Sequence, residues 1–400
     1  MSNINKWDKN IPVEKSNYLQ DDKVTFFNVD NSQFNKNSLK LLDLFCGAGG
    51  FSVGCNWAGI ESVMGIDHFE PAIKTWVKNH PNSIGCLGDI TQINPYEIKN
   101  ILKKKDVDKI NLITGGVPCQ GFSIANRKHN DSDTRNFLFL EYMKFVKVFR
   151  PDYIILENVS GMRSTAGGHF ENAIKSYMEN LGYIVSIKML NAADYGVPQI
   201  RQRLLFVGVN KTISNIPYVF PVGLYKDKYI TVGEAIGDLP SLNNNEYKTQ
   251  YESKPYTNYQ KLMRGEIKSI NINKPTYLAN HQAPNHPENT IKRIRETTPG
   301  NPMYPKFKQR IRLNNENPSP TQLAGGIRPQ FQFGHPTESR GLSIRERARL
   351  QSFPDEYVFE GGIVQERVQT GNAVPPLLIY ELIKPIVNNL SVKKGKNSNV

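Results

Sequence analysis

The chain has 400 residues, of which 38% are hydrophobic and 22% charged, so it is long enough for two domains and a sizeable core. Fifty Lys and Arg against 37 Asp and Glu give a formal net charge of +13, which favours a polyanionic partner, and no amphipathic basic helix or long apolar span argues for a membrane. Four cysteines without a C-x-x-C pair exclude a zinc finger, and the N-terminus has no apolar signal segment. These features predict a cytoplasmic protein with free thiols.

The two ends of the chain are polar. Residues 1–38 form an extension in which only residues 24–29 are apolar enough to add an edge strand. Residues 391–400 are predicted to be a frayed, solvated tail.

A buried strand is predicted at residues 39–45, followed by the glycine-rich turn CGAGGF and a helix that reaches Trp57. Such a turn lets the backbone approach a ligand closely, although a glycine-rich turn taken alone is more often a plain tight turn. Ser52 stands where the third glycine of a dinucleotide fingerprint would be, and no phosphate-binding G-x-x-x-x-G-K motif follows.

Acidic residues end the next two predicted strands. Asp67 follows residues 62–66, about twenty residues after the glycine turn. In a doubly wound sheet, an acidic residue at this position hydrogen-bonds the ribose hydroxyls of a ligand. Its alternative role is to cap the helix at residues 69–79. Asp89 repeats the placement and could reach an adenine ring. Three βα units with polar groups at their carboxyl ends predict a cofactor crevice.

A further strand, residues 110–114, runs into the sequence GGVPCQGFS and presents Cys119 in a shaped loop. A thiol held there suits nucleophilic catalysis, whereas most free cysteines are small buried hydrophobes. The strand at residues 153–156 delivers Glu157 to the same sheet edge, as an acid partner for Cys119 or as another helix cap.

Residues 126–135 form a polar loop that suits phosphate contacts in a lid or is simply solvated, and a helix follows at residues 137–149. Strands are predicted at residues 183–190 and 203–209. Between them, Arg201 and Arg203 alternate along an extended chain, so they can bind phosphate or a base carbonyl, or pair with surface acids.

Regular periodicity fades between residues 211 and 340, where 18 Lys and Arg against 10 Asp and Glu contribute +8 of the net charge. Two basic pieces, residues 292–295 and 306–312, frame a loop at residues 318–330, which predicts a separate domain facing nucleic acid. We therefore divide the chain into the extension 1–38, a catalytic domain 39–212, a target-recognition domain 213–354, and a return to the catalytic domain with the tail at 355–400.

Together these pieces resemble the cytosine-C5 DNA methyltransferases, from residue 41 to about residue 387. The resemblance is carried, in the family order, by DLFCGAGG at 43–50, PCQGFS at 118–123, ENV at 157–159, QIRQR at 199–203, residues 345–354 and GNAVP at 371–375. Cys46, Asn126 and Ala373 depart from the residues that are common in the family.

The resemblance implies an α/β fold: a doubly wound S-adenosylmethionine-dependent methyltransferase sheet with a second, smaller, irregular target-recognition domain. It implies S-adenosylmethionine as cofactor, no metal, Cys119 as nucleophile, Glu157 as the group that hydrogen-bonds cytosine, and Arg201 and Arg203 near the base and its phosphate. The residues expected around the cofactor are Phe45, Gly47, Gly49, Asp67, His68, Asp89, Ile90, Leu138 and Asn372.

Sequence choice is expected to lie in the second domain, where Thr321 matches a family threonine. Arg328, Gln330 and Gln332 alternate after it and suit base contacts in a groove, although Arg328 could equally bind only phosphate.

The implied reaction begins with addition of the Cys119 thiolate to C6 of a flipped-out cytosine in double-stranded DNA, after which C5 takes the methyl group. The alternatives are a tRNA cytosine methyltransferase of the same fold, a non-catalytic DNA-binding protein and a nicotinamide dehydrogenase. No cysteine follows Cys119, which argues against the tRNA enzymes with a Cys-Phe-Thr signature. We expect a monomeric prokaryotic modification enzyme, associated with the nucleoid through DNA, that protects host DNA from a separately acting restriction endonuclease.

Overall fold

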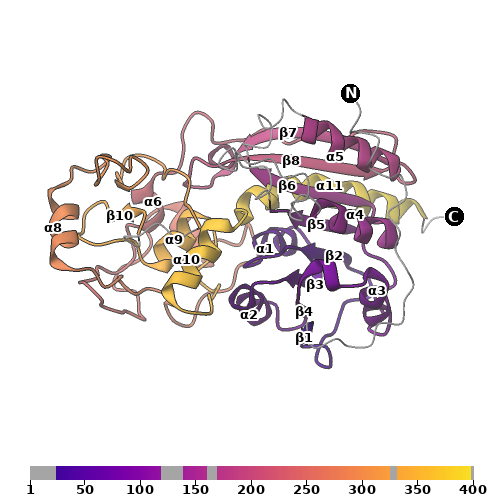
Figure 1. Cartoon of the computed structure of the whole chain (residues 1–400), viewed down its shortest axis with the longest axis horizontal. Helices are drawn as coiled ribbons and strands as arrows, with labels where there is room; N and C mark the ends of the chain where they lie inside the picture. Colours follow the sequence, from indigo (N-terminus) through magenta and orange to yellow (C-terminus); the bar gives the residue numbers. More distant parts are fainter. Residues whose placement is uncertain (1–23, 119–137, 160–168, 325–330, 398–400) are drawn as a thin grey trace.

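The computed structural model describes residues 24–118, 138–159, 169–324 and 331–397 (Figure 1). Within these residues, eight strands form one sheet in the order β1-β4-β3-β2-β5-β6-β8-β7. The strands are β1 (Thr25–Phe27), β2 (Leu39–Leu44), β3 (Ile60–Asp67), β4 (Ile84–Leu87), β5 (Leu112–Gly116), β6 (Tyr153–Val159), β7 (Tyr183–Asn191) and β8 (Gln202–Asn210). β1 confirms the edge strand predicted in the N-terminal extension.

The centre of the sheet is parallel, because β2 pairs with β3 and β5, β3 with β4, and β5 with β6. β1, β8 and β7 are antiparallel to their neighbours. Every residue of β2 is buried, as expected for a parallel strand covered on both faces. The chain winds outward in opposite directions from β2 and β5, so a crevice opens at their carboxyl ends. This arrangement confirms the predicted doubly wound sheet.

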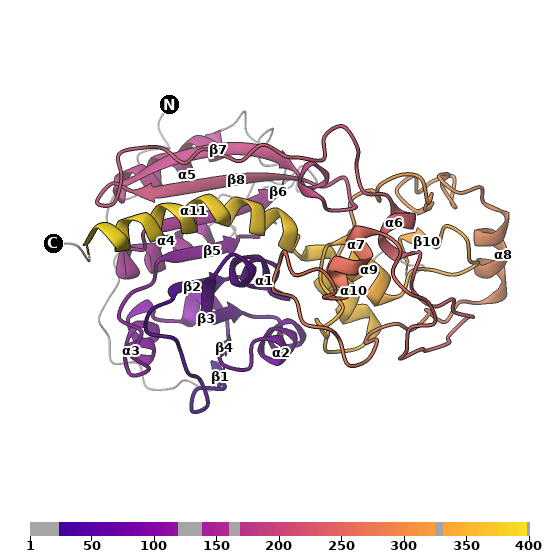
Figure 2. The same ribbon diagram turned by 180° about the vertical axis from the view of Figure 1, so that it is seen from behind.

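Helices cover both faces of the sheet. α1 (Gly50–Trp57), α2 (Glu70–Asn79) and α11 (Pro376–Asn397) lie on one face, which Figure 2 shows with α11 in front. α3 (Pro95–Lys103), α4 (Leu138–Phe149) and α5 (His169–Asn180) lie on the other, seen in Figure 1. Each face has its own apolar core. In the described part of the chain, no helix is long and apolar enough to cross a membrane.

The prediction of a frayed tail is wrong for residues 391–397, because α11 continues to Asn397.

The second lobe is built from short elements, at the left of Figure 1. They are α6 (Val232–Ile236), α7 (Asn258–Met263), α8 (Glu288–Glu296), β9 (Ile311–Arg312), β10 (Phe333–Gly334), α9 (Ile344–Leu350) and α10 (Ile363–Asn372). The lobe confirms the predicted smaller, irregular domain. Its apolar residues join the core beneath α11, and the Tyr218 hydroxyl donates to the Leu382 carbonyl at 2.7 Å. The domain boundaries at residues 212 and 354 stay predictions.

Buried arginines hold the second lobe together. Arg345 and Arg349 on α9 have no exposed surface, and Arg349 bonds Asp355 at 2.6 Å and Asp238 at 2.9 Å. Arg312 donates to the carbonyls of four residues and joins α8 to the end of β10: Ile294, Arg295, Thr297 and His335. Arg310 is also buried. The basic piece at residues 306–312 therefore does not face nucleic acid throughout its length.

Candidate active site

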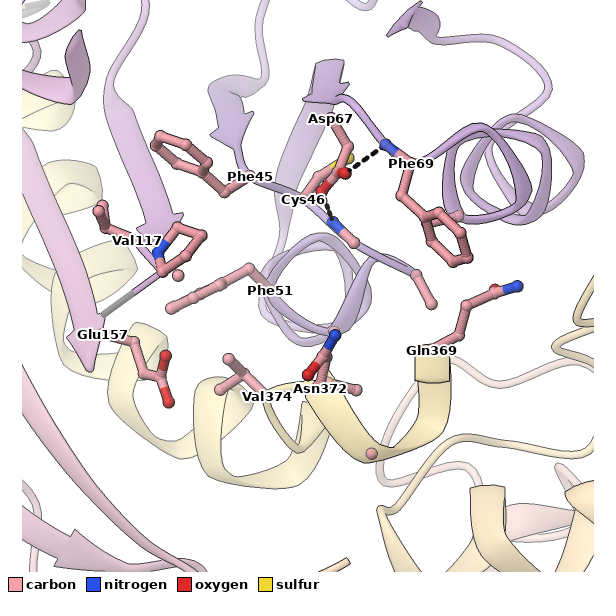
Figure 3. A pocket seen from close by; sticks show the side chains of 18 of the residues that line it. Phe45, Cys46, Phe51, Asp67, Phe69, Val117, Glu157, Gln369, Asn372 and Val374 are labelled. Carbon is pink, nitrogen blue, oxygen red and sulfur yellow. Dashed lines mark hydrogen bonds between the residues drawn. The ribbon is translucent and has the colours of Figure 1, made fainter. Parts of the chain in front are cut away.

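A cavity of about 540 Å³ opens at the carboxyl ends of β2, β3, β5 and β6 (Figure 3). The starts of α1, α2 and β8 and the end of α10 complete its wall. This is where the sequence places its glycine turn, its acidic strand ends and the segment before Cys119. The cavity therefore brings together motifs that are more than 300 residues apart in the chain.

The turn after β2 takes a left-handed path, with φ of 53° at Phe45 and Gly47 and 87° at Gly49. Phe45 is unusual in this conformation, which bulky side chains rarely adopt. A side chain at Gly50 would place its Cβ only 2.0 Å from the Val374 carbonyl oxygen. The glycines thus allow the turn to pass close against the chain that follows α10. The last residue of α10, Asn372, lines the same cavity.

Asp67 joins two parts of the cavity wall. Its Oδ2 accepts the Gly47 N–H at 2.8 Å, and its Oδ1 accepts the Phe69 N–H at 2.9 Å (Figure 3). Phe69, not Asp67, stands at the N-cap of α2. His68 lines the cavity beside them with its ring mostly exposed, and its Nδ1 lies 3.4 Å from Asp67 Oδ1. Asp67 therefore fastens the glycine turn to the start of α2.

The other predicted cofactor residues lie elsewhere. Gly49, Asp89, Ile90 and Leu138 are not among the residues that line this cavity. Asp89 is exposed and caps a short 3₁₀ helix through the Thr91 N–H at 2.9 Å. Ile90 is buried in the core, and Leu138 packs against that core at the start of α4. A cofactor role for these four residues stays a prediction.

Glu157 lies inside β6, so it does not cap a helix. Its Oε1 lies 2.5 Å from Arg203 Nε, and both side chains line the cavity. Figure 3 shows Glu157 and Asp67 on opposite sides of the cavity. Gly116 pairs with Glu157 in register, and Val117 and Pro118 continue the same wall. The segment that leads to Cys119 therefore runs beside Glu157.

Arg201 also lines the cavity, but its guanidinium is directed into the protein. It donates to the carbonyls of Gln322 at 3.1 Å, Gly371 at 2.9 Å and Ala373 at 3.0 Å. Burial lowers the pKa of Arg201 well below its usual value. Arg201 therefore fixes the chain on both sides of Asn372 to the segment that carries Thr321.

Of the predicted DNA-recognition residues, Thr321 and Gln332 are described. The Thr321 hydroxyl donates to the Ile200 carbonyl at 2.7 Å. Gln332 donates to the Thr321 carbonyl at 3.0 Å and accepts the Leu323 N–H at 2.8 Å, so its amide closes the base of the intervening loop. Arg328, Gln330 and the nucleophile candidate Cys119 lie outside the described residues.

Several lining residues escaped the sequence analysis. Phe69 follows Asp67 by two positions, Asn158 follows Glu157, and Gln369 stands one helical turn before Asn372. The Asn158 amide donates to the Val117 carbonyl at 3.3 Å, two residues before Cys119. Proximity to a recognised motif was the only signal for these residues. Among the described residues, no group of His, Cys, Asp and Glu could hold a metal ion.

The sheet and its cavity define an S-adenosylmethionine-dependent methyltransferase fold. Residues 39–388 match the model of the C-5 cytosine-specific DNA methylase family, and the chain belongs to that family. It is a DNA cytosine-5-methyltransferase.

The chain is similar to curated type II methyltransferases of bacteria. It is 33% identical over 380 residues to M.DdeI of Desulfomicrobium norvegicum, which covers 87% of this chain and 88% of the relative. It is 32% identical over 362 residues to M1.HphI of Haemophilus parahaemolyticus, covering 88% and 87% respectively.

Solved structures agree with the fold. A prophage-encoded Escherichia coli protein, described as a DNA modification methyltransferase, matches with a TM-score of 0.71 and 26% identity over 88% of this chain and all of that one. The Schizosaccharomyces pombe Dnmt2 methyltransferase matches 88% of this chain and 99% of its own with a TM-score of 0.57, but its 16% identity shows likeness of fold alone.

Proposed function

We propose that this enzyme methylates C5 of a flipped-out cytosine within a specific double-stranded DNA sequence, through a covalent bond between Cys119 and C6. We further propose that it is the modification enzyme of a type II restriction–modification system and protects host DNA from a separate endonuclease. The curated relatives of that type, at 33% and 32% identity over most of the chain, support the setting.

One observation carries the chemical proposal. The wall formed by Gly116, Val117 and Pro118 leads directly to Cys119 and runs beside Glu157, in a cavity whose opposite side is the glycine turn and Asp67. The segment that leads to the proposed nucleophile, an acidic side chain and a glycine turn suited to a cofactor thus line one cavity, which supports methyl transfer to an activated ring.

The cavity fits S-adenosylmethionine, which supplies the methyl group when bound. A turn of glycines allows close approach of a ligand, and Asp67, with further lone pairs on its carboxylate, suits ribose hydroxyls. Gly47, Phe45, His68 and Asn372 would surround the cofactor from the same walls.

Cytosine C5 is a poor nucleophile until a group adds at C6. The Cys119 thiolate forms the bond to C6, while Glu157 stabilises a proton at N3, and C5 then takes the methyl group. Loss of the C5 proton and departure of the thiolate restore the aromatic ring. Arg203 orients Glu157 through their ion pair. A cytosine stacked in a duplex cannot enter such a cavity, so the base must be flipped, at a cost of a few kcal/mol.

Base choice is assigned to the loop between Thr321 and Gln332. Its base is held by Gln332 and by the bond from Thr321 to Ile200. Arg328 and Gln330 within the loop are proposed to contact bases, guanine suiting an arginine and adenine a glutamine.

The nucleophile is tested by replacing Cys119 with serine, whose hydroxyl is far less nucleophilic than a thiolate. With S-adenosylmethionine present, wild type should form a denaturation-resistant adduct with DNA that contains 5-fluorocytosine, and C119S should form none. DNA and cofactor binding should persist in the variant. Equal adduct in both proteins would remove Cys119 from the mechanism.

The substrate is tested separately. Labelled methyl groups should enter DNA and not tRNA, and bisulfite sequencing of host DNA should show one methylated sequence. Label in tRNA alone would replace the DNA assignment with the tRNA alternative.

A further inference from the structure

Asp43, at the end of β2, is a carboxylate that the proposed mechanism does not use. It has no exposed surface. Its Oδ1 accepts the Thr114 hydroxyl at 2.8 Å and its Oδ2 accepts the Ser52 hydroxyl at 2.7 Å. The Ser52 oxygen in turn accepts the Trp76 Nε1–H at 3.0 Å. Among the described residues, no cation lies within ion-pair distance of Asp43. A buried carboxylate without a counter-charge is costly, which calls for a functional explanation.

The partners of Asp43 belong to the elements that build the cofactor side of the cavity. Ser52 lies in the first turn of α1, directly after the glycine turn. Thr114 lies on β5, four residues before Pro118, and Trp76 lies on α2, whose start lines the cavity. Asp43 therefore sits beneath the cavity floor, and its own oxygens are occupied by protein donors.

The carboxylate of Asp43 interacts electrostatically with the cavity wall. Cys46 lines the cavity, and the carboxylates of Asp67 and Asp43 add to burial in raising the pKa of its thiol. The lining arginines, Arg201 and Arg203, lie with Glu157 at the other side. The cavity is thus negative toward the glycine turn, whereas on the other side the Glu157 carboxylate is paired with Arg203.

We propose that the Asp43 carboxylate is the fixed counter-charge for the cationic sulfonium of S-adenosylmethionine, and that it strengthens binding of this cofactor relative to S-adenosylhomocysteine, which lacks the sulfonium charge. The inference rests on the proposed use of S-adenosylmethionine. A buried charge acts over several ångströms because little water screens it, so contact with the ligand is unnecessary. Asp43 is a positioning residue whose effect is electrostatic. Methyl transfer removes the positive charge from the ligand, so the same carboxylate favours exchange of product for fresh cofactor.

Binding of a cation should also be linked to a proton. Burial raises the pKa of Asp43 to about 6 in the free protein. A nearby cation lowers that pKa, so binding near pH 6 releases a proton, and affinity should rise as pH increases from 5 to 7 and then level off. The other titratable groups that interact with Asp43 are Asp67, Cys46, Cys55, Tyr142 and Tyr357. Burial raises the pKa values of these thiols and phenols well above their usual values, so they do not titrate between pH 5 and 8.

The test is direct binding by titration calorimetry at pH 5.5, 6.5 and 8, in buffers of different ionisation enthalpy. The probes are S-adenosylmethionine, S-adenosylhomocysteine and sinefungin, which carries an amine in place of the methylsulfonium. Asp43→Asn should weaken binding of the two cationic probes by about tenfold or more relative to S-adenosylhomocysteine, since one unit of pKa coupling is a tenfold change in affinity. The proton release seen with wild type should disappear.

Thr114→Val is the matched control, because it keeps the carboxylate but removes one hydrogen bond that stabilises its charged form. Its pH midpoint should move upward, while its preference for the cationic probes at pH 8 should remain. This variant also decides the matter if Asp43→Asn does not fold. Equal weakening of all three probes by Asp43→Asn, or an unmoved midpoint in Thr114→Val, would overturn the inference. Failure of wild type to bind any probe would instead overturn the proposed function.

Discussion

Asp67→Asn is the substitution that most directly tests how the cofactor side of the cavity is built. Asparagine can keep the oxygen that accepts the Phe69 N–H at 2.9 Å. Its amide nitrogen then faces the Gly47 N–H, which loses the acceptor that Asp67 Oδ2 provides at 2.8 Å. The variant therefore changes one bond and one charge at a side chain that is mostly buried.

A hydrogen bond to a charged group contributes about 1.5–3 kcal/mol. In Asp67→Asn the glycine turn lacks the Gly47 hydrogen bond, so cofactor binding must itself hold the turn in place. The affinity for S-adenosylmethionine should then fall about 10- to 150-fold. Calorimetric titration at pH 8 measures this fall, and circular dichroism checks that the variant is folded. DNA affinity without cofactor should hardly change. An unchanged dissociation constant in a folded variant would refute the assignment of Asp67 to the cofactor cradle.

The same variant separates fastening of the turn from direct contact with ribose. If Asp67 also binds the ribose hydroxyls, the Asp67→Asn substitution should weaken binding of a deoxyribose analogue of the cofactor less than it weakens binding of S-adenosylmethionine. Equal losses for the two ligands would leave Asp67 with the fastening role alone.

Three further substitutions address the framework. Gly50→Ala places a Cβ 2.0 Å from a backbone oxygen of Val374 and should cost about 1–3 kcal/mol of stability in urea unfolding; an unchanged midpoint would contradict this contact. Arg349→Met should lower stability in urea unfolding by about 3 kcal/mol, because it removes the nearest cation from the buried Asp355 carboxylate, whereas Asp238 keeps Arg264. His335→Asn keeps an acceptor for the two backbone N–H groups bound by Nδ1 but cannot titrate. Burial lowers the pKa of His335 from 6.5 to about 4, so the wild type should lose about 3 kcal/mol as pH falls through that window, and the variant should show a shallower decline.

Much of the catalytic sheet could be predicted because its signals are local. The apolar run at residues 39–45 predicts a buried strand, and β2 occupies Leu39–Leu44. The acidic residue that ends β3 lies at the crevice because strand order, not side-chain packing, determines that position. The motifs also fixed the family, which the family model confirms.

The sequence could not reveal which polar side chains turn inward. Gln332 was expected to point into a groove from its alternation with Arg328, but its amide bonds the backbone of Thr321 and Leu323. Alternation describes side chains on a straight extended strand, and it does not indicate that one amide serves two backbone groups of the same chain. The sequence identified Asp43 only as part of a motif. Nothing in the sequence indicates that its carboxylate is buried and accepts hydrogen bonds from two hydroxyls.

Net charge was an equally incomplete guide to the surface. The second lobe owes its excess charge partly to arginines such as Arg310 and Arg312, which are buried and stack on aromatic rings or bond backbone carbonyls. Arginine suits this structural role because its planar fork can serve several acceptors at once. These two side chains are therefore unavailable for direct contacts with phosphate, although their charge still counts toward the +8 of residues 211–340.

Arg201 shows how the internal arginines serve the site. The sequence offered phosphate, a base carbonyl or a surface acid as its partner, yet its guanidinium donates to Gln322, Gly371 and Ala373. Gly371 has no side chain, and a Cβ there would lie 2.4 Å from Ala324 Cα. The chain around Asn372 and the segment at residues 322–324, which precedes the proposed recognition loop, are therefore packed and bonded together. We therefore expect that a displacement of either segment would break hydrogen bonds of Arg201 to the other, because one guanidinium serves acceptors in both.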